Sequence, residues 1–290
     1  MSTLEAATGY RASHTLPLWA EVRRQASRRR TQLALGFMVL LPLIILVAFE
    51  FGGGESDPDE DGDGGGAFSS IADLATSSGL NFTLFCLAVS AGFLLVVVVA
   101  LFFGDTVASE ASWGSLRYLL AIPVPRARLL GVKLIVAAGY SLLAMLTLAG
   151  TGLLIGTLRY GWGPLGSTIA AEIPPAEGVL RLLGILAYLS VTLLVVAGLA
   201  FLLSVMTDAA LGAVGGAVML WILSSILNQI EALGDLRAVL PTYYTEAWRG
   251  LLSTPVQSEE LAKGAISAVI YAAVLWSLAF YRFTRKDVTS

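Results

Sequence analysis

Few residues in this 290-residue chain have types and spacings that could do chemistry. The most suggestive set, Asp57-x-Asp59-x-Asp61-Gly62-Asp63, matches the start of a calcium-binding loop. The twelfth position of that loop is Phe68 instead of a bidentate glutamate, and Pro58 argues against a flanking helix. Residues 50–78 are acidic and Gly-rich without lysine or arginine, so we expect a flexible external loop that attracts cations only weakly.

Several kinds of catalytic and metal-binding site are excluded by what the sequence lacks. His14 is the only histidine and Cys86 the only cysteine, which rules out a histidine-based cluster or a disulfide within one chain. There is no phosphate-binding G-x-x-x-x-G-K-[ST] loop, and neither H-E-x-x-H nor G-x-S-x-G occurs. We therefore expect a chain that is not an enzyme and binds no cofactor or metal itself.

The chemistry that remains is concentrated in a polar interval, residues 105–133, between two apolar runs. Apolar residues recur there at three- and four-residue steps, which predicts an amphipathic helix over residues 106–120 lying along a membrane surface. Pro123 and Pro125 would end that helix. Basic residues follow, which we expect to hold the exit of the loop on the cytosolic side: Arg126, Arg128 and Lys133.

The same interval resembles the coupling-helix segment of ABC-2-type transporter permeases. The residues that carry the resemblance are Glu110-x-x-x-Gly114-Ser115-Leu116-Arg117-x-Leu119-Leu120, then Pro123-x-x-Arg126 and Lys133. The ending Phe283-Thr284-Arg285-Lys286-Asp287 is also similar to C-termini of that family. In the family this segment is the first cytoplasmic loop and docks into a groove on a partner ATPase. The resemblance implies ATPase coupling through Glu110, Gly114, Ser115, Leu116, Arg117 and Arg126.

Composition favours a membrane protein, with 56% hydrophobic and 13% charged residues; a soluble domain carries about 25% charged residues. Six apolar segments are long enough to cross a bilayer of about 30 Å. We expect spans at residues 33–49, 82–103, 134–157, 179–206, 209–230 and 262–281. Four glycines in the third span favour close helix approach: Gly139, Gly150, Gly152 and Gly156.

Charge distribution sets the expected topology. Arginines cluster in residues 1–32, where a short interfacial helix with Trp19 is expected, and basic residues recur in the 105–133 loop and the tail, residues 282–290. Six spans place all three regions on one side, which the positive-inside bias makes cytosolic, with both termini. We read the N-terminal arginines as a topology signal and expect no nucleic-acid partner. The expected location is the cytoplasmic membrane of a prokaryote.

Uncharged residues within the spans are candidates for a substrate pathway. The set is Phe82, Phe85 and Phe93 in the second span and Met219, Trp221 and Asn228 in the fifth. The alternative is that these aromatic side chains face lipid or pack between helices, and that Asn228 bonds a neighbouring helix or caps the span.

The sequence thus predicts an all-α polytopic membrane protein with six transmembrane helices, like an ABC-2 (type V) exporter. The resemblance implies two permease subunits, identical or different, and separate ATPase subunits that bind ATP and Mg²⁺. The expected substrate is a hydrophobic or amphipathic small molecule or a lipid. Two alternatives stay open: an integral membrane enzyme acting on lipid, and an ion-coupled secondary carrier. The predicted spans contain almost no ionisable residue, which argues against the carrier.

Overall fold

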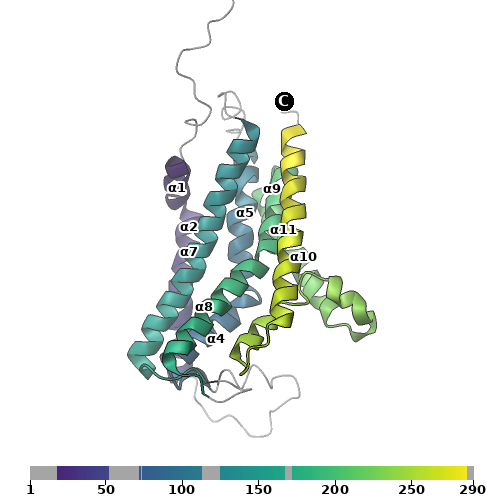
Figure 1. Cartoon of the computed structure of the whole chain (residues 1–290). Coiled ribbons are helices and arrows are strands. Elements are labelled where there is room, and N and C mark those ends of the chain that lie inside the picture. The colour runs from purple at the N-terminus through teal and green to yellow at the C-terminus, as the bar shows by residue number, and fades with distance from the viewer. Residues whose placement is uncertain (1–17, 52–71, 73, 113–124, 167–171, 286–290) are drawn as a thin grey trace, which may run out of the picture.

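The computed structural model describes residues 18–51, 72, 74–112, 125–166 and 172–285, which form a bundle of helices (Figure 1). Its elements in chain order are α1 Leu18–Ala26, α2 Arg29–Phe51, α4 Gly79–Ala91, α5 Leu94–Ser112, α7 Arg126–Tyr160, α8 Pro175–Thr192, α9 Leu194–Met206, α10 Ala210–Asn228, the 3₁₀ segments η2 Glu231–Val239 and η3 Ala247–Leu252, and α11 Glu259–Arg285. Within these residues the only sheet-like pairing is an isolated bridge between Leu165 and Ile173.

The predicted all-helical fold class is confirmed for the described part of the chain, and the apolar helices fit a multi-pass membrane protein. Five helical stretches there are long and apolar enough to span a membrane, or six if the bent pair α4 and α5 forms one span. The five are α2, α7, α8 with α9, α10 and α11. Four of them extend beyond the predicted apolar segments, because helical hydrogen bonding continues into flanking polar residues whose charges find partners elsewhere.

The second predicted span, residues 82–103, is two helices instead of one. The axes of α4 and α5 differ by 58°, and Gly92 and Phe93 separate them. Glycine is a weak helix former, and Ser90 Oγ donates to the carbonyl of Cys86 four residues earlier; a serine–glycine pair of this kind is a recognised cause of sharp kinks. The bend lets α4 pack on α7 and α8 while α5 packs on α9 and α10.

Packing divides the helices into an inner and a peripheral set. The helices α5, α9 and α7 lie among several neighbours, whereas α2 packs mainly on α7. In α2, α10 and α11, only 22% of the most apolar window is buried within the chain. Large apolar side chains on these helices therefore face outward, as they do in helices whose solvent is lipid.

Close approach between α4 and α7 depends on Gly156 of α7 and Gly79 of α4. A Cβ on Gly156 would lie 2.9 Å from Phe82 Cβ and 3.0 Å from Gly79 Cα, so any side chain there would force the helices apart. Gly152 also faces α4, but a Cβ there would lie 3.6 Å from Thr83 Cα, an ordinary contact that does not require glycine. The expectation was wrong for Gly139 and Gly150, because no atom of the described part of the chain lies within 4 Å of a Cβ at either position.

The basic regions meet at one end of the bundle. The end of α5 and the start of α7 are joined to α1 there by ion pairs, and Arg126 Nη1 donates to the carbonyl oxygen of Thr284 near the end of α11 at 3.2 Å. Figure 1 shows this end at the top, with α1 and the last turn of α11 on opposite sides of it. At the other end, Glu50 of α2 pairs with Arg159 of α7 at 2.8 Å.

The glycine contact generates a stability prediction. Gly156→Ala should destabilise the fold by about 1–3 kcal/mol, the usual cost of overpacking a close contact. Gly150→Ala on the same helix is the matched control, because its added methyl group would meet no neighbour. The measurement is the apparent Tm of each purified variant in detergent. A Gly150→Ala protein that melts as early as Gly156→Ala would contradict this packing.

Candidate functional site

A buried cluster of charges at the α1 end of the bundle is the main polar feature of the described helices. The Lys133 ammonium of α7 lies between two carboxylates, with Nζ 2.6 Å from Glu110 Oε1 of α5 and 3.2 Å from Glu21 Oε1 of α1. Arg24 Nη1 donates to the same Glu110 oxygen at 2.7 Å. The side chains of Lys133 and Glu110 are 2% and 1% exposed. We call Glu21, Arg24, Glu110 and Lys133 the inner cluster.

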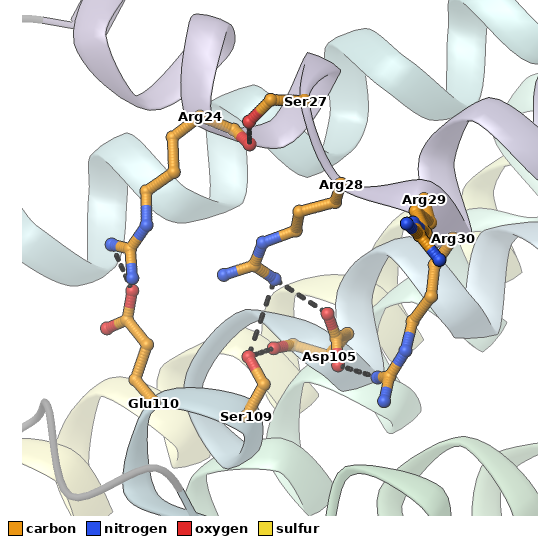
Figure 2. Close-up of a pocket in the computed structure, with 8 residues that line it drawn as sticks. All are labelled: Arg24, Ser27, Arg28, Arg29, Arg30, Asp105, Ser109 and Glu110. Atoms are coloured by element: carbon orange, nitrogen blue, oxygen red, sulfur yellow. Dashed lines mark hydrogen bonds and ion pairs between the residues drawn. The ribbon is translucent and has the colours of Figure 1, made fainter.

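A second group of charges lies beside the inner cluster and faces a pocket. Asp105 of α5 accepts from Arg28 Nη1 at 2.6 Å and from Arg30 Nη1 at 2.5 Å. Ser109 Oγ donates to the backbone carbonyl of Asp105. Figure 2 shows Arg24, Arg28 and Arg30 extending from the α1–α2 region toward the two carboxylates of α5. The pocket between them has a volume of about 470 Å³.

These ion pairs hold α1 against α5 and α7 at this end of the bundle. An unpaired charge in a site of low dielectric costs several kcal/mol, so each buried carboxylate is stable only with its basic partner in place. The inner cluster contains two acidic and two basic side chains, so its formal charges sum to zero. Nine-residue helices such as α1 are marginal in isolation. The position of α1 therefore depends on these ion pairs and on the Tyr140 hydroxyl, which donates to the Val22 carbonyl at 2.8 Å.

The residues assigned to ATPase coupling fall partly inside α5. The stretch from Thr106 to Ser112, expected in a surface helix, is the last part of α5, and Glu110 is buried against Lys133. Arg126 is the first residue of α7. Gly114, Ser115, Leu116 and Arg117 lie outside the described residues, as does the acidic segment with the aspartate repeat.

The residues proposed for a substrate pathway are dispersed instead of lining one cavity. Phe82 is buried against the Tyr160 ring of α7, with ring centroids 5.7 Å apart, and Phe85 packs on Phe49 of α2. Phe93 and Met219 are exposed on the outside of the bundle. Trp221 is buried in α10, and Asn228 is the last residue of that helix. Their contacts are those of helix packing and of an apolar outer surface.

Sequence reasoning missed the role of the buried charges. Lys133 was expected at the exit of a loop on the cytosolic side, and the structure shows that it lies inside α7, enclosed by Glu21 and Glu110. Asp105 was read as the first loop residue, yet it lies inside α5. Asp105 and Lys133 each lie directly beside an apolar run, and this position is the sequence signal that could have identified them as helical and buried. Within the described part of the chain, no group of three or more metal-ligating residues occurs.

The inner cluster generates a double-mutant prediction. Lys133→Met should destabilise the protein by about 3–5 kcal/mol, because it leaves buried carboxylates without their ammonium partner. Adding Glu110→Leu should recover a large part of that loss, since the remaining Arg24 and Glu21, 3.7 Å apart, can pair with each other. Apparent Tm values of the wild type, both single variants and the double variant form the cycle. Strictly additive losses would mean that the two side chains are not coupled.

Comparison with models of protein families gives a match. A family model described as "Protein of unknown function (DUF2705)" matches residues 60–289. No curated protein matches the chain. The matched region includes Asp105, Glu110 and Lys133, whereas α1 and α2, with Glu21 and the arginines of the pocket, precede it. Because the model covers most of the chain, the protein belongs to the DUF2705 family.

Proposed function

We propose that this protein is the membrane-spanning permease subunit of an ATP-driven exporter of the ABC-2 type. The proposal combines three features: a helical bundle with five to six apolar helices, a central segment with the coupling pattern, and no phosphate-binding loop in the chain. ATP and Mg²⁺ would be bound by a separate ATPase subunit, and a second permease subunit would complete the transporter. The substrate would be a hydrophobic or amphipathic small molecule or a lipid.

The observation that carries the proposal is how the coupling segment is attached. Residues 113–124 connect α5 to α7, and the Glu110–Lys133 pair ties these two helices together close to the points where that segment leaves them. A displacement imposed on the segment by a moving ATPase would therefore reach α5 and α7 together, and α1 through Glu21. Packed side chains and ion pairs of this kind can carry energetic coupling between two sites.

The orientation follows from charge. The end that carries the inner cluster also carries Arg126 and the last basic residues of α11, and positive charge is retained on the cytosolic side of membranes. An ATPase that uses cytosolic ATP would meet the permease on this side. We accordingly propose a multi-pass protein of a prokaryotic cytoplasmic membrane with both termini in the cytosol.

An ion-coupled carrier is a second candidate because of the buried charges. The predicted spans held almost no ionisable residue, but α5 and α7 extend to include Asp105, Glu110 and Lys133, all buried. Buried carboxylates in spanning helices are the usual sites of proton or sodium coupling. The two candidates differ in energy source: an exporter requires ATP and its partner, whereas a carrier works in vesicles that hold only an ion gradient.

Topology is the first test. With Cys86→Ser as background, a cysteine at position 59 should react with a membrane-impermeant maleimide in intact cells, whereas one at position 126 should react only after lysis. The reason is the positive-inside bias of the basic end. Labelling at position 126 from outside intact cells would overturn the proposed orientation.

The coupling segment provides the second test. Gly114→Trp should lower substrate-stimulated ATPase activity and transport by about tenfold, within the usual range for the loss of coupling between sites. The bulky side chain would block close approach of a partner at that glycine. Gly36→Trp is the matched control, because Gly36 is exposed on α2 with no neighbour within 4 Å of a Cβ.

The assay uses the permease co-purified with its ATPase and reconstituted in vesicles. Full activity of the Gly114→Trp complex would show that this segment is not the docking element. ATP-independent transport that is driven by an ion gradient and abolished by an ionophore would instead favour the carrier.

A further inference from the structure

We propose that the arginine-lined pocket at the α1–α2 junction binds the phosphate group of an anionic phospholipid, whose acyl chain lies along an exposed apolar stripe of α2. The site shares Glu110 with the transport proposal, but its arginines and the apolar stripe of α2 have no part in the coupling to an ATPase, so lipid binding can be tested separately from transport.

The pocket lining has an excess of positive charge. It comprises Arg24, Ser27, Arg28, Arg29, Arg30, Asp105, Ser109 and Glu110. Four arginines face two carboxylates, which leaves two positive charges in excess. Arg29 is exposed and has no hydrogen bond or ion pair within the described residues, so its guanidinium is available to a ligand (Figure 2). Guanidinium groups bind phosphate oxygens in a bidentate manner, which suits this ligand class.

The level of the pocket matches that of lipid headgroups. Twenty residues separate Arg30 from Glu50 along α2, which is about 30 Å of helix and equals the thickness of the hydrocarbon core. Glu50 is paired with Arg159 at the far end. If α2 spans the bilayer, the arginines lie at one interface and this pair at the other. Trp19 of α1 is 72% exposed near the arginine end, as expected for an interfacial anchor.

An apolar stripe leads away from the pocket along the same helix. Its residues recur at alternating four- and three-residue steps and are all exposed: Leu33, Phe37, Leu40, Ile44 and Val47. Arg29 and Arg30 precede Leu33 by four and three positions, so they stand one turn above the stripe on the same face of α2. A charged pocket continuous with an apolar track fits a phospholipid, whereas a free phosphate ion would use only the pocket.

The test is a titration of purified protein in detergent with phosphatidylglycerol, monitored by native mass spectrometry, with phosphatidylcholine as the zwitterionic comparison. Wild type should bind phosphatidylglycerol more tightly than phosphatidylcholine. Arg29→Gln should weaken phosphatidylglycerol binding about fivefold, the factor expected for one basic residue at a membrane surface. Arg29→Lys keeps the charge and should bind nearly as the wild type does.

Arg282→Gln is the matched control, because it removes an exposed arginine from the last turn of α11, outside the pocket. Its affinity should equal that of the wild type, and size-exclusion profiles of all variants should be unchanged. Displacement of phosphatidylglycerol by millimolar inorganic phosphate would identify a soluble-anion site and overturn the lipid assignment. Equal affinity for phosphatidylglycerol and phosphatidylcholine would overturn it as well. So would a loss of phosphatidylglycerol affinity in Arg282→Gln as large as that in Arg29→Gln.

Discussion

The ammonium group of Lys133, held between the carboxylates of Glu110 and Glu21, is the constraint on which the arrangement of the bundle depends. It joins three helices that are far apart in the sequence, α1, α5 and α7, at a single buried point. At the other end of α7, Gly156 packs directly on Gly79 of α4. The 35-residue α7 is thus fixed by charge pairing at one end and by backbone packing at the other, with α2 packed along its length.

The glycine contact and the buried ion pairs, which hold the two ends of α7, respond differently when the helices are pulled apart. A glycine contact between backbones weakens gradually as the helices separate, because dispersion forces are individually small. A buried ion pair instead exposes charge as it opens, so it separates only where water or another partner replaces the lost contact. The end with the inner cluster should therefore move as one unit. The 58° bend between α4 and α5 allows these two helices to pack on different neighbours.

Much of the fold could be predicted from the sequence because spanning helices are long apolar runs, and the segments predicted at residues 33–49 and 262–281 both lie within observed helices. The bend at Gly92 was not predicted, although Ser90 and Gly92 are a sequence signal for a kink, because the sequence does not specify which neighbours the two halves of the run contact. Gly150 and Gly156 are equivalent in sequence, and only tertiary packing distinguishes them. Glu110 was expected in a surface helix and Lys133 at the exit of a loop, because their partners Arg24 and Glu21 lie 86 and 112 positions away in the sequence.

The most direct test of the inner cluster is the distance between α1 and α7 in the membrane-embedded protein. Spin labels at Ala20 and Ile135, both exposed in the structure, would report it by double electron–electron resonance in a Cys86→Ser background. We predict a single narrow distance distribution in the wild type that becomes broad when Lys133 is replaced by Met. A broad distribution in the wild type, or a narrow one that persists in Lys133→Met, would contradict the claim that this ion pair fixes α1 to the bundle.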